Sequence, residues 1–254
     1  MRVLKYTATV ILVTAVFIAS AFINKRKVAA TNTGKGFAVI ELFTSEGCSS
    51  CPPADAVVAK IQKESNGKPI YILAFHVDYW NRLGWKDVFS SADYSDRQKQ
   101  YAAWLHSTDG IYTPQIVVNG KTEFVGSEEA TLRNAIKTNL QMDAAAQVSL
   151  SDVQAGEQKI NLHYQTQGNI THAVLQLALI QKTAQTKVER GENAGHTLSH
   201  VQIVRQIQTV TLKRADGVTN ITLPKGVDVH GGELIAFLQD TSNGVITGAT
   251  KVEL

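Results

Sequence analysis

The chemistry of this chain centres on its two cysteines, Cys48 and Cys51, which stand three positions apart in the stretch FTSEGCSSCPPAD. Such a pair can close into a disulfide and reopen to a dithiol, so it can carry out thiol–disulfide exchange. The same spacing can also give a fixed structural bridge or two thiolate ligands for a metal ion. The pair alone therefore leaves three kinds of site open.

The residues that flank the pair favour a redox site. The apolar run 37–43 predicts a strand before it, and the spacing of apolar residues in 57–61 predicts a helix after it. A helix N-terminus offers unpaired N–H groups and the positive end of the macrodipole, which favour a thiolate. The two prolines that follow Cys51 fit a first helical turn. We expect Cys48 to be the nucleophile and Cys51 to resolve the mixed disulfide.

Two other kinds of site fit the cysteines less well. A structural bridge across so short a loop removes little chain entropy, so it stabilises the fold weakly. A structural zinc site needs four ligands, and the first half of the sequence has no second Cys-x-x-Cys and no His-x₃₋₅-His. His196 and His200 have i+4 spacing, but they stand in a polar segment, where we expect solvated histidines.

Polar and aromatic residues follow the second predicted strand, residues 69–77. His76 and Asp78 come at its carboxyl end, the edge where open α/β sheets place their sites. His76 there could lower the pKa of a thiol or shuttle a proton, or both residues could fix the next segment by hydrogen bonds. Trp80 and Trp85 could line a groove for a peptide or apolar ligand, or form a small local core.

The pattern of apolar residues changes along the chain. Up to residue 143 it predicts alternating strands and helices, including a helix over 93–106, a hairpin over 115–126 and a helix over 127–140. From residue 147 seven short strand-like runs alternate with turn signals, a pattern typical of a β-sandwich. The expected architecture is therefore an α/β domain over 36–143, with an insertion before the hairpin, followed by an all-β sandwich-like domain over 147–254.

The N-terminus predicts export. Two basic residues precede an apolar run over 6–23, and a basic cluster follows it. Its length lies between a signal-peptide core and a full membrane span, so residues 1–30 are either a cleaved signal peptide or an N-terminal membrane anchor. Cleavage after Ala21 or Ala30 would lower the formal net charge from +3 to +1 or to −2. We expect a periplasmic or secreted protein, which in the anchored form is tethered to the inner membrane through residues 6–23.

Two pairs of longer motifs resemble known families. VIELFTSEGCSSCPPAD and GIYTPQIVVNGKTEFVG together resemble the thioredoxin superfamily, with a strand, Cys-x-x-Cys, a helix and then a proline before the last hairpin and helix. FHVDYWNRLGWKDVFSS and RGENAGHTLSH resemble a family of exported bacterial proteins catalogued as domain of unknown function 1223. This second similarity extends over about residues 37–254.

The thioredoxin resemblance implies roles for three residues. Pro114 would be cis and would pack against the disulfide, and Thr113 would offer backbone hydrogen bonds to a bound peptide. Glu41 is the nearest match to the buried acid that accepts a proton beneath the second cysteine. The sequence departs from small thioredoxins at Gly47, where they carry an aromatic residue, and in the long segment 76–110 before the proline.

The sequence thus favours an exported protein that performs thiol–disulfide exchange without a cofactor. Its partners would be a protein or small-molecule disulfide and a separate redox protein, and the Ser49-Ser50 pair does not fix the direction of exchange. A binding module that holds copper or a small ligand between Cys48, Cys51 and His76 is one alternative, since thiolates and imidazole suit Cu(I). An interaction scaffold with an inert disulfide is another. No basic patch interleaved with aromatics indicates nucleic-acid binding.

Overall fold

The computed structural model describes residues 35–65 and 67–254. The predicted signal peptide or anchor over 1–30 lies outside the described residues. Within the described part of the chain, no helix is both long enough and apolar enough to cross a membrane.

The first half of the described chain alternates strands and helices, as its apolar pattern predicts. Its strands β1 and β2 are buried along their whole length. The helices bury one face each; α2, for example, buries Ala54, Val58 and Ile61. The elements are β1 (Ala38–Thr44), α2 (Pro52–Glu64), β2 (Ile70–His76), the short 3₁₀ helix η1 (Asn81–Leu83), α3 (Ala92–Trp104), β3 (Gln115–Val118), β4 (Thr122–Val125) and α4 (Glu129–Gln141).

The second half forms seven strands, the number that its alternating runs predict. Several of these strands alternate buried and more exposed residues, as β6 does along most of its length. They are β5 (Ala146–Ala155), β6 (Lys159–Gly168), β7 (Ala173–Lys187), β8 (Thr197–Thr211), β9 (Asp216–Thr222), β10 (Glu233–Asp240) and β11 (Ile246–Glu253).

The strands do not divide into the two architectures expected from the sequence. Strands from both halves join in one mixed sheet of eight strands, in the order β11-β10-β7-β8-β2-β1-β3-β4. The remaining strands form a three-stranded sheet, β5-β6-β9. The expected fold class, a thioredoxin-like α/β domain followed by an all-β sandwich, is therefore wrong. The described chain is a mostly β structure whose first-half strands continue directly into those of the second half.

The halves join where β2 and β8 lie side by side as parallel strands, with Ala74 opposite Ile203. On the other side of β2, the parallel partner β1 is in register from Ala38 opposite Ile70 to Thr44 opposite His76. The loop after β1 thus starts beside the end of β2. Because β8 is the next strand along, a side chain from the second half can reach the same loop.

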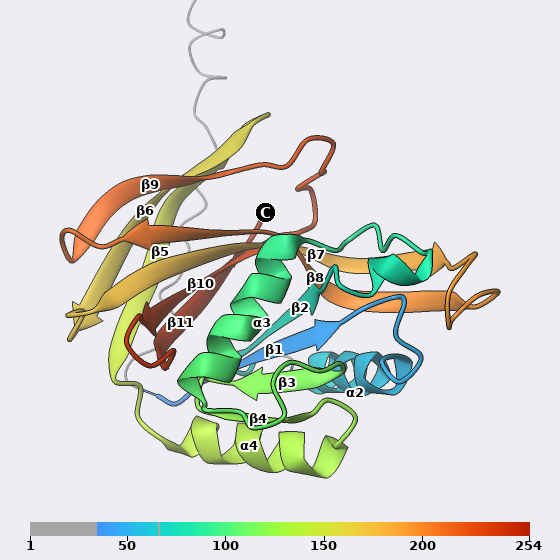
Figure 1. Cartoon of the computed structure of the whole chain (residues 1–254). Coiled ribbons are helices and arrows are strands. Elements are labelled where there is room, and N and C mark those ends of the chain that lie inside the picture. Colours follow the sequence, from blue (N-terminus) through green and yellow to red (C-terminus); the bar gives the residue numbers. More distant parts are fainter. Residues whose placement is uncertain (1–34, 66) are drawn as a thin grey trace, which may run out of the picture.

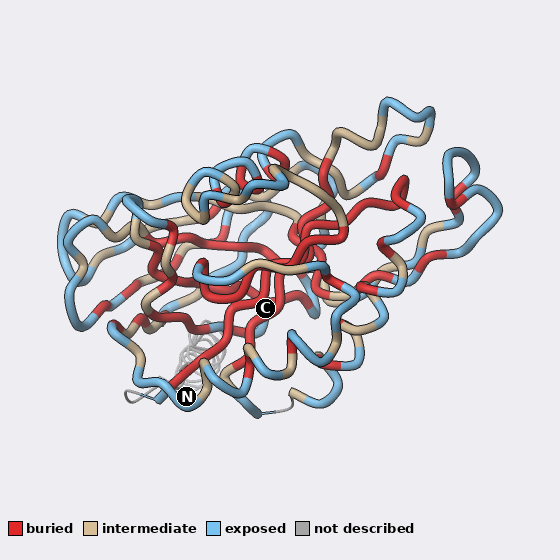
Figure 2. The backbone as a smooth tube through the Cα atoms, turned by 60° about the horizontal axis from the view of Figure 1, so that its bottom comes forward, coloured by how far each residue is buried: buried red, intermediate tan, exposed pale blue. Residues whose placement is uncertain are grey.

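Three hydrophobic clusters hold the layers together. One lies between α3 and one face of the large sheet, and it takes residues from both halves, such as Phe43, Tyr101 and Phe237. On the other face, α2 and α4 cover β1, β2 and β3, and the small sheet covers β7 and β10. Figure 1 shows α3 lying across the sheet, and Figure 2 shows the buried strands in the middle of the molecule.

Candidate functional site

The two cysteines form a disulfide at the start of α2. Cys51 is the N-cap residue of this helix, and the two prolines occupy its first positions. The observed helix starts at Pro52, three residues later than the predicted helix, which starts directly after Cys48. Both cysteines are fully buried, whereas Ser49 and Ser50 between them are exposed.

The bond between Thr113 and Pro114 is cis, as the resemblance implies, and it lies beside the disulfide. The Thr113 carbonyl oxygen is 3.8 Å from Cys48 Sγ. The Trp80 indole Nε1 donates a hydrogen bond of 2.8 Å to the Thr113 hydroxyl, so Trp80 fixes this segment. At Gly47 an added Cβ would lie 3.1 Å from the Trp80 Cβ. Trp80 thus leaves little room there for the aromatic side chain that small thioredoxins carry.

Asp55 is the carboxyl group that shares a helix face with the disulfide, one turn after Cys51. Its Oδ1 accepts a hydrogen bond of 3.2 Å from the Thr44 hydroxyl at the end of β1. Burial raises the pKa of Asp55 to about 6, and the neighbouring His76 and His200 oppose this rise only in part. A carboxyl with such a pKa can both hold and release a proton near neutral pH.

His76 lies at the end of β2, as predicted, and forms a buried pair with Asp87. The His76 Nδ1 is 2.7 Å from Asp87 Oδ2, and each side chain is 1% exposed. Burial alone would lower the pKa of His76, but the Asp87 carboxylate outweighs it and the pKa is raised. Burial likewise would raise the pKa of Asp87, but the charge and hydrogen bond of His76 lower it.

Glu46 connects this pair to the cysteine-bearing loop. Its backbone N–H donates a hydrogen bond of 2.8 Å to Asp87 Oδ2, and its carboxylate Oε2 accepts one of 2.7 Å from the Trp85 indole. Its Oε1 lies 3.4 Å from His200 Nε2. Neither of these two atoms makes a hydrogen bond within the described residues, although both side chains are buried.

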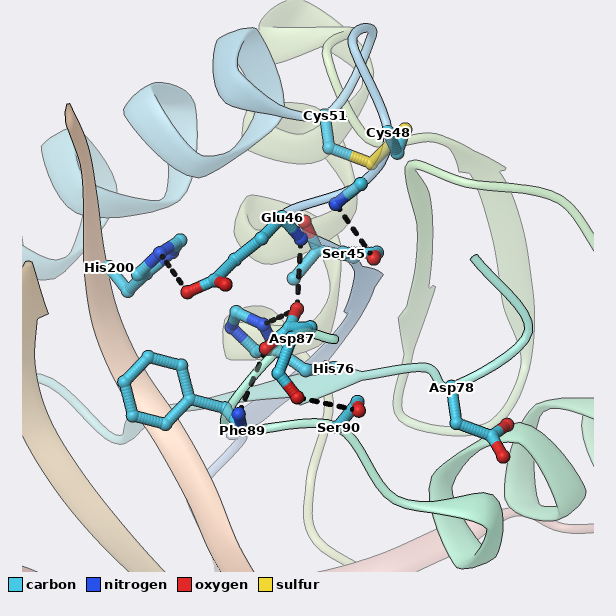
Figure 3. A network of polar contacts seen from close by, with 12 residues as sticks. Ser45, Glu46, Cys48, Cys51, His76, Asp78, Asp87, Phe89, Ser90 and His200 are labelled. Carbon is cyan, nitrogen blue, oxygen red and sulfur yellow. Dashed lines mark hydrogen bonds and ion pairs between the residues drawn. A yellow bond between two sulfur atoms is a disulfide. The ribbon is translucent and has the colours of Figure 1, made fainter. Parts of the chain in front are cut away.

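The rings of His76 and His200 meet edge to face, with 4.9 Å between their centroids. Figure 3 shows the disulfide above Glu46, whose carboxylate points toward His200, and His76 beside Asp87. We call the five residues Glu46, Asp55, His76, Asp87 and His200 the charge cluster; four of them are buried, and Asp55 is partly buried. Within the described residues, no group of three or more Cys, His, Asp or Glu side chains is arranged to hold a metal ion.

A segment from the second half also contacts the cysteine-bearing loop. The Asn193 side-chain Nδ2 donates hydrogen bonds of 2.9 Å to the Glu46 carbonyl and 3.0 Å to the Cys48 carbonyl. The Ser49 N–H donates one of 3.0 Å to the carboxylate of Glu192. These contacts place residues from the connection between β7 and β8 against the disulfide loop.

The comparisons with known proteins identify the family of this chain. The profile of the family described as "Protein of unknown function (DUF1223)" matches residues 39–239, which include the Cys-x-x-Cys motif, the charge cluster and Asn193. The chain belongs to the DUF1223 family. No curated protein matches it.

Among solved structures, the DUF1223 chain is similar to a protein of Agrobacterium tumefaciens. The two share 28% identity with a TM-score of 0.63, and the match covers 85% of this chain and 93% of the other. A β-glucosidase from Kluyveromyces marxianus matches over 53% of this chain and 18% of the β-glucosidase chain, with 16% identity. Its TM-score of 0.23 is too low to indicate a shared fold. The comparisons do not confirm membership of the thioredoxin superfamily.

The DUF1223 structure brings most of the predicted site residues together, but not all of them. Cys48, Cys51, Thr113, Pro114, Trp80, Trp85 and His76 lie at or next to the disulfide loop. Glu41 instead forms a buried ion pair with Arg97 at 2.5 Å, in the cluster under α3 on the other face of the sheet. Asp78 accepts a hydrogen bond of 2.5 Å from Ser95 in α3, apart from the disulfide in Figure 3.

Sequence reasoning missed four residues of this site and misjudged a fifth. Glu46, Asp55, Asp87 and Asn193 lie in the predicted motifs but drew no attention, because polar residues in loops and helix starts are commonly solvated. His200, expected to be solvated, is 3% exposed. The useful signal was its place inside RGENAGHTLSH, a motif that carried the family resemblance.

Proposed function

We propose that this DUF1223 protein performs thiol–disulfide exchange through Cys48 and Cys51. The observation that carries the proposal is the closed Cys-x-x-Cys disulfide directly before α2, with Asp55 one turn along the same helix. A carboxyl whose pKa is raised to about 6 can serve as a proton acceptor or donor beside a buried sulfur. The cis Thr113–Pro114 segment contributes a main-chain carbonyl next to Cys48.

In the reducing direction the dithiol form transfers two electrons to a substrate disulfide. The Cys48 thiolate attacks one substrate sulfur, which forms a mixed disulfide and releases the other sulfur as a thiolate. The Cys51 thiolate then attacks Cys48 Sγ, closes the Cys48–Cys51 disulfide and releases the second substrate thiolate. A separate thiol-containing redox protein returns two electrons to the disulfide. In the oxidising direction the same steps run backwards.

Asp55 fits the role of proton carrier for Cys51. The Cys51 thiol must lose its proton before it can attack, and Asp55 is the carboxyl that follows it by one helical turn. Once the disulfide has formed, the proton held by Asp55 can leave, because a pKa of about 6 lies below neutral pH. The charges of His76 and His200 favour this ionised form.

Trapping of the mixed disulfide tests the proposal. Cys51→Ser should form a stable adduct of one substrate per chain with a disulfide-containing peptide, because no second thiol can release it. Cys48→Ser is the matched control, and it should trap far less. Mass spectrometry of the non-reduced protein measures both adducts. Equal trapping by the two variants, or none by either, would argue against Cys48 as the nucleophile.

A binding scaffold with an inert disulfide is the second candidate function, because both cysteines are fully buried. In that case the protein would act as a binding scaffold, and its two thiols would take no part in exchange. The disulfide form would then resist reduction under conditions that reduce exchange proteins.

A further inference from the structure

The connection between β7 and β8 lies against the disulfide loop, and the proposed exchange reaction gives it no role. We call residues 188–196 the cap. Val188 anchors its base and is fully buried, whereas most residues of its tip are exposed. Asn193 is the exception at the tip, because it is 6% exposed and its side chain reaches into the disulfide loop.

The hydrogen bonds described above join the cap to main-chain groups of that loop, and the Ser49 side chain also interacts with Glu192. Asn193 donates to the carbonyls of Glu46 and Cys48, and Glu192 accepts from the N–H of Ser49. Hydrogen bonds from Ser49 lower the pKa of Glu192, so its carboxylate is ionised at neutral pH. The cap thus pairs with three main-chain groups of the loop, the carbonyls of Glu46 and Cys48 and the N–H of Ser49, of which only Ser49 belongs to an exposed residue.

Both cysteines are buried in this structure, which limits their access to a partner. A thiolate must approach a disulfide sulfur before it can attack, so accessibility limits the rate. Both cysteines are 0% exposed, with Thr113 near Cys48 on one side and the cap hydrogen-bonded across residues 46–49 on another. The disulfide is therefore inaccessible in this structure. The cap has mostly exposed side chains, and three hydrogen bonds join it to main-chain groups of the disulfide loop, so few contacts have to break for it to move.

We propose that the cap occupies the position of a bound peptide, and that the partner in exchange is an extended segment of another protein that displaces it. This inference rests on the proposed thiol–disulfide exchange. A peptide main chain carries both an N–H donor and a carbonyl acceptor in each residue, so it can replace the amide of Asn193 and the carboxylate of Glu192. A small disulfide without amide groups gains no such compensation for breaking the contacts of the cap.

The first step of chemical reduction tests the cap independently of catalysis. A reagent thiolate attacks Cys48 Sγ, the Cys48–Cys51 bond breaks, and a mixed disulfide and the Cys51 thiolate form. We would measure the rate of this step in the oxidised full chain by acid quenching and mass spectrometry. The probes are 2-mercaptoethanol and a ten-residue peptide with one central cysteine, with rates corrected for the thiolate fraction.

In the wild-type chain the peptide thiolate should react faster than 2-mercaptoethanol. Asn193→Ala and Glu192→Ala should accelerate 2-mercaptoethanol at least about tenfold, and the peptide much less, because each substitution removes hydrogen bonds that close the cap. Glu192→Gln keeps a hydrogen-bond acceptor. Its rate with 2-mercaptoethanol should therefore lie between those of the wild type and Glu192→Ala. Glu189→Ala, an exposed residue of the same cap, is the matched control and should react like the wild type.

Two results would overturn the inference. If both Ala variants stay within twofold of the wild type with 2-mercaptoethanol, the cap does not limit access. If both reagents react equally in the wild type and are accelerated equally, the partner is not recognised as a peptide. Glu192 is exposed, so its variants keep the test valid should Asn193→Ala unfold, which urea denaturation would reveal. Faster reduction of cap variants without trapping by Cys51→Ser would uphold the cap and reject the exchange function.

Discussion

The raised pKa of Asp55 makes a quantitative prediction about stability. Burial raises the pKa of the Asp55 carboxyl from 3.8 to about 6, a difference of about 2. Each unit corresponds to about 1.4 kcal/mol, so the ionised carboxyl destabilises the fold by about 3 kcal/mol at most. The neutral amide of Asp55→Asn keeps the acceptor for the Thr44 hydroxyl and has no charge to bury.

The sign of the pH dependence follows from the direction of the shift. Because the folded-state pKa of Asp55 is the higher one, the folded state binds the proton more tightly than the unfolded chain does. This contribution to stability is fully present below pH 3.8 and is lost as the pH rises through about 6. Asp55→Asn should therefore have about the same stability as the wild type near pH 4, and should be more stable by up to about 3 kcal/mol at pH 8.

Urea denaturation of the disulfide-containing protein at both pH values measures this difference. Asp109→Asn is the matched control, since Asp109 lies exposed in a loop, and its effect should be within about 0.5 kcal/mol at both pH values. A difference between Asp55→Asn and the wild type that is the same at pH 4 and pH 8 would refute the reasoning. Destabilisation by Asp55→Asn at pH 8 would refute it as well.

Three further changes have defined outcomes. Asp87→Asn should lower the pKa of His76, because burial then acts without the carboxylate, and NMR titration of the imidazole measures this. The same change should lower the free energy of unfolding by about 3 kcal/mol in urea denaturation, because it breaks a buried ion pair. Glu41→Gln should cost about 3 kcal/mol in urea denaturation, because it leaves the Arg97 guanidinium buried without its partner. Reduction of the disulfide should lower the free energy of unfolding by only about 2 kcal/mol, because the bridge closes a loop of four residues. Circular dichroism of the reduced protein should therefore show a folded chain at 25 °C, and an unfolded chain would contradict this.

Local patterns in the sequence predicted the elements well. The helices and strands of the first half follow from apolar spacing, and the seven strands of the second half follow from alternation between turn signals. These signals depend on neighbours within about ten residues. Each describes a single element, so none of them specifies which strands pair.

The arrangement of the strands could not be predicted in the same way. The sheet continues from the first half into the second because β2 pairs with β8, across more than 120 residues between Ala74 and Ile203. β2 is apolar and fully buried, whereas β8 alternates apolar and polar residues, and neither sequence specifies the other strand as its partner. The expectation of two separate architectures failed at this pairing.

The site residues also divide into those that local sequence motifs predict and those that depend on long-range strand pairing. The cysteines, His76 and the cis proline could be predicted from motifs close to one another in sequence or from a family pattern. His200 and Asn193 reach the disulfide loop only because β8 lies next to β2, so their roles depend on the pairing that the sequence did not reveal.

The reduction potential of the Cys48–Cys51 pair tests the central proposal most directly. Equilibration of the purified chain with glutathione and dithiothreitol redox buffers, followed by alkylation and mass spectrometry, measures it. The exchange function predicts a potential between about −270 and −120 mV, the range of thiol–disulfide oxidoreductases. A pair that stays oxidised below about −300 mV, as structural disulfides do, would contradict it.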